Sequence, residues 1–570
     1  MRIRIVNFIF LGVFLIIAMV LLGTEVIHGK RFRQLSNKNC IRLVPQLGTR
    51  GRILDREGNV IADSYLSYDV MLLPQPDDNV DDVLSGVAKV LGIKQQELKE
   101  RFKKEFIALS LPVTIAGNIP VKKAVALEEK KMDLPGVVIQ PHPLRRYPYG
   151  ELACHLLGYL GEIDRWRLTK LEDYGYKTRD IVGFGGVEER YDYYLRQEEG
   201  GFSTQVDHRG RFVRTLGYRS PQNGKDIQLT LDLRVQKLAE EALGRQVGSV
   251  VVMEPASGEI IAMANNPVFN PAAFVDRKSD AGLKRLFNDP KSPLINRAIS
   301  STYPPGSVFK IVVASAALET GKININTTTD CTGSFYVGQQ RFACWNTHGT
   351  QNVVGALMHS CNVFFYRTGL LVGPQAIYEY ALRFGLSRPS GIDLPYEASG
   401  FVPSPLWKRV YHFRAWFNGD TANLAIGQGD LLVSPVQIAR AMAVFANNGF
   451  LVTPYVLKGV GGKDVSLYQR KFSRVSLKDS TIDIVRQGLR KVASEGGTAS
   501  NLSGLGVEVA GKTGTAQVGR GLPHGWFAGF LPYKNPRFVI CVFLEHGGAG
   551  YYASTTAKRI IEGMVKEGII

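Results

Sequence analysis

The sequence predicts an α+β protein: an antiparallel sheet covered by helices, a strand-rich region before it, and one apolar helix at the N-terminus. Three observations predict this architecture. In residues 225–570, strand-like stretches come first and last, and helical stretches dominate from 307 to about 450. This order is typical of an antiparallel sheet covered by helices from the middle of the chain. Residues 31–224 contain many strand-like and glycine-rich pieces, and the first 30 residues contain a long uncharged stretch.

The uncharged stretch runs from Ile5 to Thr24, and its 20 positions are enough to cross a bilayer. A cleaved signal peptide is the competing interpretation, but its apolar core would be shorter and would end at a small-residue cleavage site. No convincing site of that kind follows in GTEVIHGKRF. We therefore expect residues 1–30 to form a short cytoplasmic tail and an uncleaved, single-pass anchor in the cytoplasmic membrane. Because long domains translocate largely regardless of charge, we expect the rest of the chain on the extracytoplasmic side.

Residues 31–224 are predicted to form a pedestal domain. The stretch 48–73 alternates apolar and polar positions around DREGN, which predicts a β-hairpin with its turn at Glu57-Gly58-Asn59. Residues of about 77–135 are charged and helix-patterned, and we expect them to form a small inserted head lobe. Turn-forming residues cluster at RSPQNGKD, residues 219–226, and mark the end of the pedestal.

Residues 225–570 are predicted to form the second large domain. A strand leads into an amphipathic helix in 227–245, and two strands joined by a Pro-Ala-Ser-Gly turn follow in 248–265. The closing strands are VEVAGKTGTAQV, GWFAGFL and RFVICVFLEH. With 570 residues, the chain is long enough for two to four domains.

The composition excludes some functions. Hydrophobic residues make up 45% of the chain, enough for well-filled cores, and the formal net charge is +18. A basic chain can bind nucleic acid, anionic lipid or an acidic polymer. No zinc-finger spacing, helix-turn-helix pattern or aromatic RNA-binding signature is present, so nucleic-acid binding is not expected. For an anchored protein, a solvated basic face near lipid headgroups is the simpler explanation.

The stretch SSTYPPGSVFKIVVASAALETG places a serine and a lysine one turn apart where a loop becomes a helix. Residues i and i+3 share a helix face, so the Ser307 hydroxyl and the Lys310 amine can come within hydrogen-bonding reach. A lysine can activate a serine nucleophile if burial or nearby positive charge lowers its pKa. Serine is also a preferred N-cap, so the pattern alone does not establish catalysis.

Two further motifs follow in order, Ser360-Cys361-Asn362 and Lys512-Thr513-Gly514-Thr515. With Ser307 and Lys310 they give the S-x-x-K, S-x-N and K-T-G pattern of the penicillin-recognising serine acyl-transferases, which the chain resembles. Each motif is weak by itself, but three in this order within one domain indicate a catalytic site.

The resemblance implies a role for each residue. Ser307 would attack a peptide carbonyl and hold the acyl group as an ester, and Lys310 is the candidate base, although that assignment is disputed in the superfamily. Ser360 and Asn362 would relay protons and fix the substrate amide. Lys512 would attract a substrate carboxylate and help to keep Lys310 neutral.

The substrate-binding residues are expected on the last of these motifs. Thr513 and Thr515 would offer hydroxyls to the substrate carboxylate, and Gly514 would let the substrate lie against the strand. The resemblance also implies that the backbone N–H groups of Ser307 and Thr515 form the oxyanion hole. Strand propensity and a β-bulge are the plainer explanations for these residue types.

The chain resembles the class B penicillin-binding proteins over almost its whole length, in stretches such as RGRILDREGNVIA, INRAISSTYPPGSVFK, AIGQGDLLVSPVQIA and HGWFAGFLP. The stretch FLEHGGAGYYAS and the charged head lobe resemble the elongation-type group, penicillin-binding protein 2; the division type is the alternative. The resemblance implies the penicillin-binding transpeptidase fold on an elongated, dimerisation-type pedestal. It implies a β-lactam-sensitive D,D-transpeptidase that cross-links peptidoglycan stem peptides and works with a polytopic glycan polymerase of the RodA type and other elongation-complex proteins.

Two other functions would use the same motifs. A β-lactamase or carboxypeptidase would hydrolyse the ester, and no clear candidate for a deacylating carboxylate is visible. A non-catalytic scaffold or β-lactam sensor would keep the anchor and pedestal, but the intact Ser307, Lys310 and Lys512 argue against it.

A cysteine cluster lies beside the S-x-N motif. Cys331, Cys344, His348 and Cys361 have the spacing C-x12-C-x3-H-x12-C, and three thiolates with one imidazole would make a closed, structural zinc site. Asp330 is the alternative to Cys331, and a disulfide or free thiols are the competing interpretations. Some elongation-type members resemble this pattern in carrying a metal near the same loop. No cofactor is expected for the acyl-transfer chemistry itself.

Overall fold

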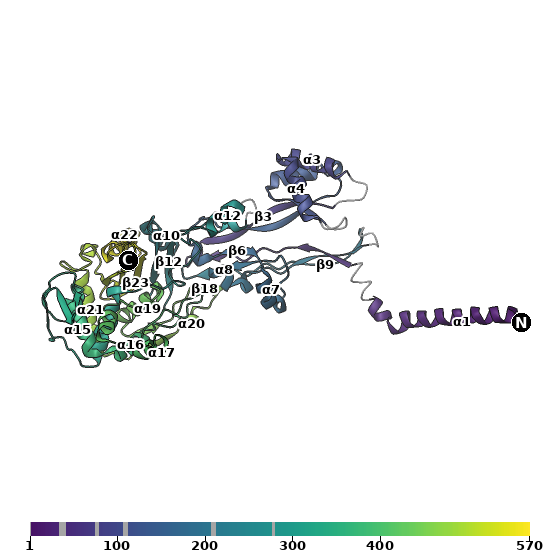
Figure 1. Ribbon diagram of the computed structural model, residues 1–570. Helices are drawn as coiled ribbons and strands as arrows, with labels where there is room; N and C mark the ends of the chain where they lie inside the picture. The colour runs from purple at the N-terminus through teal and green to yellow at the C-terminus, as the bar shows by residue number, and fades with distance from the viewer. Residues whose placement is uncertain (1, 34–40, 74–78, 107–111, 207–211, 276–279) are drawn as a thin grey trace. The chain divides into compact units, whose positions relative to one another are not determined.

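The computed structural model describes residues 2–33, 41–73, 79–106, 112–206, 212–275 and 280–570 (Figure 1). The chain forms two compact units that interleave in the sequence. The first contains residues 1–50, 64–144 and 196–224, and the second contains 51–63, 145–195 and 225–570. These two units do not coincide with the predicted pedestal domain and second domain, which divide at residue 224. Those domain boundaries stay a prediction.

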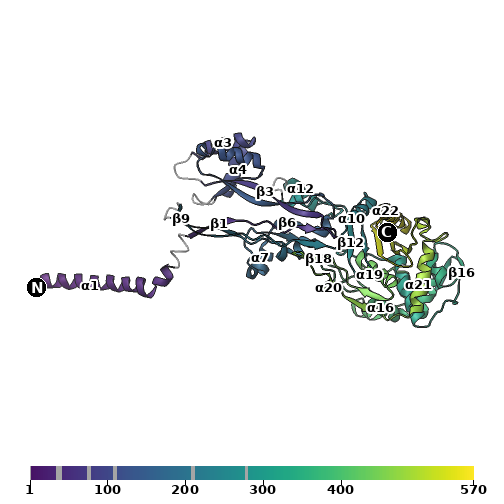
Figure 2. The same cartoon turned by 180° about the vertical axis from the view of Figure 1, so that it is seen from behind.

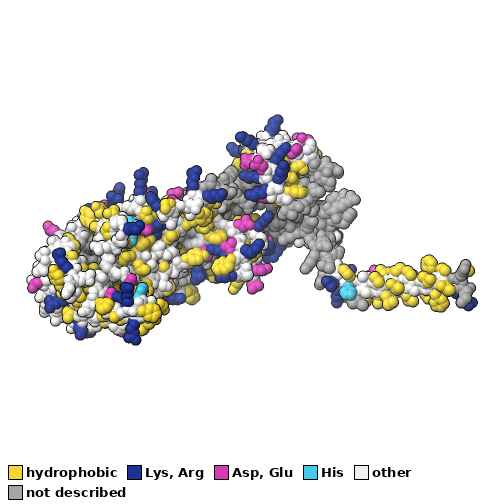
Figure 3. Space-filling model, viewed as in Figure 1, with side chains coloured by type: hydrophobic (Ala, Val, Ile, Leu, Met, Phe, Trp, Pro, Cys, Tyr) yellow, Lys and Arg dark blue, Asp and Glu magenta, His cyan; other side chains and the backbone are white. Residues whose placement is uncertain are grey.

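The first unit begins with helix α1 (Arg2–Leu22). Residues Ile3–Val26 are long and apolar enough to span a membrane, and an 18-residue window within them has a mean hydropathy of 3.0. Their side chains are not buried against other parts of the protein, and Figure 3 shows hydrophobic side chains along the helix. This agrees with the predicted anchor in length and composition.

The rest of the first unit consists of a three-stranded sheet and a helical lobe. In the sheet, β8 (Gly200–Val206) pairs antiparallel with both β1 (Ile41–Gln46) and β9 (Phe212–Arg219). The lobe covers the strands β4 (Val113–Ile119) and β5 (Val137–Arg146) with three helices. These are α3 (Val80–Leu91), α4 (Gln95–Glu105) and α5 (Val121–Glu129).

The lobe forms where helix periodicity predicts it. Helix α3 buries Val83, Leu84 and Val87 on one face, and it ends at Gly92, whose φ of 67° gives the left-handed C-cap that glycine adopts without strain. The predicted hairpin turn at 57–59 is also present, in the second unit. There the buried Asp55 carboxylate accepts hydrogen bonds from the backbone N–H groups of Glu57 and Asn59.

The second unit contains the predicted antiparallel sheet, with strands in the order β12-β11-β23-β22-β21. All four neighbouring pairs are antiparallel. The strands are β11 (Gly248–Met253), β12 (Ile260–Asn266), β21 (Ala510–Ala516), β22 (His524–Leu531) and β23 (Phe538–Leu544). Every residue of β11, β22 and β23 is buried, because helices cover both faces of the sheet.

Helices α10 (Leu233–Leu243) and α22 (Gly550–Lys566) pack together on one face of the sheet (Figures 1 and 2). Helix α19 (Pro435–Ala446), whose residues are all buried, packs on the other face. Further helices extend the core on that side: α13 (Lys310–Glu319), α14 (Val353–Met358), α15 (Asn362–Val372), α18 (Asn418–Ala425) and α21 (Asp479–Val492). The predicted α+β class and helix-covered antiparallel sheet are therefore confirmed.

The predicted run of helices from 307 onward is interrupted by short strands. Between 329 and 351, β13 (Thr329–Cys331) pairs with β16 (Gly349–Gln351), and β14 (Ser334–Val337) pairs with β15 (Gln340–Ala343). Strands of three or four residues are too short to give a period-2 signal in the sequence. They are important here because Cys331 lies at the end of β13, and Cys344 and His348 directly flank β15 and β16.

Candidate active site and cysteine cluster

Ser307 lies in a 3-10 turn, Gly306–Phe309, directly before α13. Its side chain is partly exposed, whereas Val308, Phe309 and Lys310 are buried. Gly306 has a φ of 54°, and a Cβ added there would lie 2.7 Å from the Thr515 carbonyl oxygen. The turn therefore needs glycine both for its backbone conformation and for its close approach to β21.

Lys310 is fully buried beneath this turn. Its Nζ donates hydrogen bonds to Asn362 Oδ1 at 2.6 Å and to the Ser360 carbonyl oxygen at 2.8 Å, and Ser360 Oγ lies 3.3 Å away. Burial lowers the pKa of Lys310 to about 7. Among the described residues, no hydrogen bond joins the Ser307 hydroxyl to Lys310. The hydrogen-bond partners of the lysine come from the second motif instead.

In the second motif, Ser360 and Cys361 lie in the loop between α14 and α15, and Asn362 begins α15. Ser360 is buried and has a φ of 53°, a left-handed conformation that non-glycine residues adopt at a cost of about 1–3 kcal/mol. The side chain of Cys361 caps α15 by accepting from the Phe364 N–H. Asn362 is fixed by its amide nitrogen, which donates to the Ala343 carbonyl oxygen at 3.3 Å. This backbone geometry aims the Ser360 carbonyl and the Asn362 amide oxygen at one point, the amine of Lys310.

The third motif lies on β21, which ends the order of described strands in the sheet and pairs there with β22. Lys512 is fully buried and donates to the Thr513 carbonyl oxygen at 2.9 Å. Burial lowers the pKa of Lys512 well below its ordinary value, and the charge of Lys310 lowers it further. Lys310 is thus close enough to disfavour protonation of Lys512.

The remaining residues of β21 position it against the serine turn. A Cβ at Gly514 would lie 2.7 Å from Val308 Cγ2 and 2.8 Å from the Pro305 carbonyl oxygen, so glycine allows this contact. Thr515 is exposed, and its hydroxyl oxygen accepts from the Gly550 N–H at 3.0 Å. The structure therefore brings together all the predicted residues of the three motifs.

Several positioning residues were missed at the sequence level. The Thr498 and Thr513 hydroxyl oxygens lie 2.6 Å apart, and Gln428 donates to the Thr515 carbonyl oxygen at 3.5 Å. The Gly427 carbonyl oxygen accepts from the Gly306 N–H at 2.9 Å. Gln428 and Gly427 lie in the quoted stretch AIGQGDLLVSPVQIA, but nothing in the sequence distinguishes Thr498.

The cysteine cluster is formed as predicted by Cys331, Cys344, His348 and Cys361. One ligand atom from each lies within 4.8 Å of the others, and His348 Nδ1 is 3.5 Å from the sulfur atoms of both Cys331 and Cys344. All three cysteines are free. Tetrahedral zinc with sulfur ligands at about 2.3 Å places those ligands about 3.8 Å apart, so the donor set and its spacing fit zinc.

The cluster contacts the second motif directly. The backbone N–H of Asn362 donates to Cys344 Sγ at 3.2 Å. The alternative ligand Asp330 is exposed and accepts from the Thr350 hydroxyl, and it lies outside the four-residue group. Cys154 and Cys541, which lie outside this cluster, are both buried, and Cys40 lies outside the described residues.

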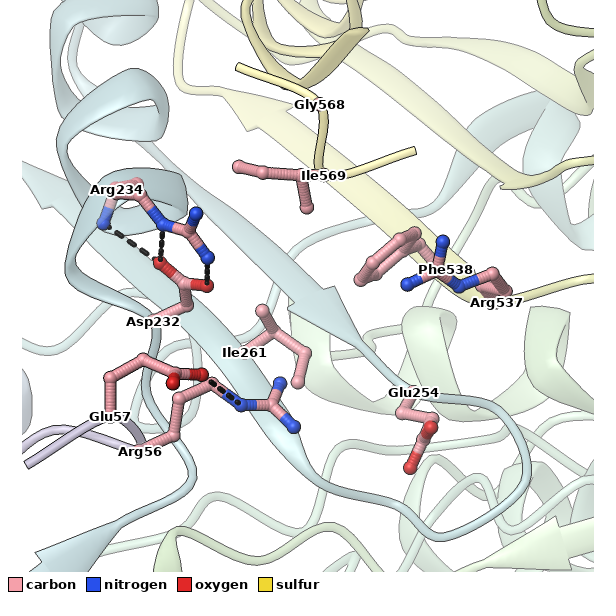
Figure 4. Close-up of a pocket in the computed structure, with 10 residues that line it drawn as sticks. All are labelled: Arg56, Glu57, Asp232, Arg234, Glu254, Ile261, Arg537, Phe538, Gly568 and Ile569. Atoms are coloured by element: carbon pink, nitrogen blue, oxygen red, sulfur yellow. Dashed lines mark hydrogen bonds and ion pairs between the residues drawn. The ribbon is translucent and has the colours of Figure 1, made fainter.

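A separate cavity of about 320 Å³ lies between the hairpin turn, β12 and the C-terminal residues of the second unit. Charged side chains of both signs line it, and Figure 4 shows Arg234 bonded to Asp232 and Arg56 facing Glu57. None of the residues of the three motifs lines this cavity, and it contains no serine, cysteine or lysine. It therefore has no group that resembles the acyl-transfer site.

Two known protein families match this chain, one in each half. Residues 248–566 match the family described as "Penicillin binding protein transpeptidase domain", and residues 45–229 match "Penicillin-binding Protein dimerisation domain". The peptidoglycan D,D-transpeptidase MrdA of Acinetobacter baumannii is 31% identical over 94% of this chain and 83% of its own length.

Two solved structures are similar over nearly the whole chain. Penicillin-binding protein 2 from Helicobacter pylori, in complex with MreC, has a TM-score of 0.83 and 29% identity, over 93% of this chain and 99% of its own. A chain from a peptidoglycan synthase complex that coordinates polymerization and crosslinking has a TM-score of 0.75 and 28% identity, over 99% and 98%.

Proposed function

Because the chain belongs to the class B penicillin-binding proteins, with the penicillin-binding transpeptidase fold, we propose that it is an elongation-type peptidoglycan D,D-transpeptidase that works through an acyl-enzyme on Ser307. One observation carries the residue assignment. A fully buried lysine lies one turn below a partly exposed serine, and its pKa is about 7. This is the environment that a serine nucleophile needs, since a lysine with an ordinary pKa would be protonated at neutral pH.

Lys310 is the base in this proposal. A neutral amine has two N–H donors and one lone pair. The donors are used by the Ser360 carbonyl oxygen and Asn362 Oδ1, at 2.8 and 2.6 Å, which leaves the lone pair for the Ser307 proton. The second motif therefore fixes the orientation of the base as well as contacting substrate.

Acylation proceeds with the donor stem peptide lying along β21, beside Ser307. Ser307 Oγ bonds to the carbonyl carbon of the penultimate D-alanine, and Lys310 takes the hydroxyl proton. The peptide bond to the terminal D-alanine breaks, and its nitrogen receives a proton through Ser360, so that free D-alanine leaves. Backbone N–H groups of Ser307 and Thr515 stabilise the oxyanion.

Deacylation transfers the acyl group to an amine. The acceptor amine attacks the ester carbonyl carbon, its proton returns to Ser307 Oγ, and a peptide cross-link forms. Lys512, Thr513 and Thr515 bind the substrate carboxylate, and Gly514 lets the peptide lie along β21. A β-lactam would acylate Ser307 in the same way and leave slowly. The chemistry needs no cofactor.

Zinc has a structural role in this proposal. Cys331, Cys344, His348 and Cys361 would hold it as a closed site with no position left for water, so it would supply no chemistry. It would hold the loop of Asn362 through Cys344 and Cys361. Metal analysis of the purified protein should find about one zinc per chain, which Cys344→Ser removes and Cys541→Ser does not. Absence of zinc in metal-replete protein would leave free thiols as the explanation.

We place the enzyme in the cytoplasmic membrane, anchored by α1, with the catalytic unit on the extracytoplasmic side. The apolar span and the MrdA relatives support this location. The similar structures, one with MreC and one from a synthase complex, support work within an assembly. A RodA-type polymerase is the partner we propose. Its co-purification with the full chain should be lost when α1 is replaced by an unrelated span.

The function is tested with uncross-linked glycan strands that carry pentapeptide stems. A transpeptidase releases D-alanine and forms cross-links in equal amounts, and both stop in Ser307→Ala. D-alanine release without cross-links would instead support a carboxypeptidase. A folded protein that releases no D-alanine would support the scaffold or sensor function.

A further inference from the structure

An exposed aromatic and basic surface lies between α17 (Pro405–Tyr411) and α18. Three of its side chains are large, aromatic and mostly exposed: Tyr411 is 72% exposed, Phe413 is 90% exposed and Phe417 is 64% exposed. Arg409 and Arg414 are exposed beside them, and the segment 405–417 contains no acidic residue. We call these five residues the aromatic-basic patch.

The patch is presented by a fixed framework. Lys408 Nζ lies 2.5 Å from Asp420 Oδ2, and the Trp416 indole N–H donates to the Thr421 hydroxyl at 2.8 Å. The ring of Trp407 packs against Phe401, with ring centroids 4.7 Å apart. These contacts tie the segment to the core, so the exposed aromatic side chains are not a consequence of a loose loop.

The backbone of Phe413 supports a binding role. Its φ is 53°, in the left-handed region that is unfavourable for a bulky non-glycine residue. Two features of Phe413 therefore make folding less favourable: its strained backbone and its exposed phenyl ring. Costs of this kind persist mostly where a side chain is held for a ligand.

One helix connects the patch to the candidate nucleophile. Phe417 is the N-cap of α18, and the helix has eight residues, Asn418–Ala425, which is about 12 Å. At its other end, the Gly427 carbonyl oxygen accepts from the Gly306 N–H, next to Ser307. Gly419, in the first turn of α18, faces Phe342 of β15, and β15 ends at Ala343, the partner of Asn362. Helix α18 thus joins the patch to the turn that carries Ser307.

We propose that the aromatic-basic patch binds the glycan strand and stem peptides of the peptidoglycan acceptor. The inference rests on the proposed function, because it names the surface that delivers the acceptor to the acyl-enzyme. Stem peptides end in carboxylates, which Arg409 and Arg414 can pair with, since no ion pair to either is found within the described residues. Sugar rings have apolar C–H faces that pack on exposed aromatic rings.

The test uses the full-length protein and fluorescently labelled, uncross-linked strands with pentapeptide stems. Two patch variants are compared, Tyr411→Ser/Phe413→Ser and Arg409→Glu/Arg414→Glu. The matched control is Leu467→Ser/Tyr468→Ser, which removes two other exposed apolar side chains, 77% and 81% exposed. We expect strand affinity to fall about tenfold in each patch variant and to stay within about twofold in the control. For strands stripped of their stems, the difference in affinity between the wild type and the arginine variant should largely disappear.

Two results would overturn the inference. One is strand binding within about twofold of wild type in both patch variants. The other is unchanged strand binding with loss of binding to anionic vesicles, which would make the patch a lipid-binding surface. Labelling by fluorescent penicillin is measured on every protein. A wild type that is not labelled would refute the proposed function, whereas labelled variants that bind strands normally would refute the inference about the patch alone.

Discussion

Asn362→Asp tests whether Lys310 is the catalytic base. The substitution keeps the shape of the side chain and places a carboxylate oxygen where Asn362 Oδ1 now lies 2.6 Å from Lys310 Nζ. An opposite charge this close favours the protonated amine and raises its pKa by about 1–3 units. From a starting pKa of about 7, the midpoint should move to about 8–10.

The expected effect on rate follows from the neutral fraction of the lysine. At pH 7 it would fall from about one half to between about a tenth and a thousandth, so acylation should slow by about 5- to 500-fold. The wild-type rate should rise with pH through about 7, because the base acts only when neutral. In the variant the same rise should occur at higher pH, and the activity should recover there.

The assay is the second-order rate constant of acylation by a fluorescent penicillin, measured from pH 5 to pH 10. Asn362→Ala is the control, because it removes the amide without adding charge. It should slow acylation at every pH and leave the midpoint near that of the wild type. If Asn362→Asp leaves the midpoint unmoved, Lys310 is not the group that titrates, and the base has been assigned wrongly.

Three further predictions concern packing and polar contacts within the second unit. Gly514→Ala should slow acylation at least tenfold and destabilise the fold by about 1–3 kcal/mol, because the new Cβ would lie 2.7 Å from Val308 Cγ2. The control is Gly519→Ala, where the space is open. Equal losses of rate and stability in the two variants would contradict this explanation. Glu188→Gln should lower the free energy of unfolding by about 3–5 kcal/mol in chemical denaturation, because it leaves Arg145 buried without the carboxylate now 2.8 Å from its Nε. As the control, Glu198→Gln breaks the exposed pair of Arg219 and Glu198 and should lower it by less than about 1 kcal/mol. A similar loss in the two variants would count against burial as the cause. Cys344→Ser should lower the acylation rate as well as the zinc content, because Cys344 Sγ accepts a hydrogen bond from the Asn362 N–H at 3.2 Å. An unchanged acylation rate in a zinc-free variant would show that the cluster does not position the second motif.

The sequence was sufficient to predict those features that depend on local chemistry. The turn at Glu57-Gly58-Asn59 needs only a carboxylate at Asp55 and residues that tolerate a tight turn, and all are adjacent in the chain. The helix-covered sheet could be predicted because its strands are long, apolar and bounded by turns. Ser307 and Lys310 could be selected because two other short motifs follow them in a fixed order.

The contacts that complete the site could not be predicted in the same way. Lys310 bonds to Ser360 and Asn362, which are 50 and 52 residues away along the chain, and no local pattern encodes such a pairing. Thr498 meets Thr513 only because α21 brings its C-terminal loop to β21. The strands of 329–351 were missed because each is only three or four residues long.

In the proposed mechanism, Ser307 carries the acyl group. The most direct measurement is mass spectrometry of the full-length protein after reaction with penicillin, with the adduct mapped to a peptide and followed for hours. We expect one penicilloyl group per chain, on Ser307, that persists for hours and is absent in Ser307→Ala. An adduct on another residue, or one that forms on Ser307 and is lost within seconds, would contradict it.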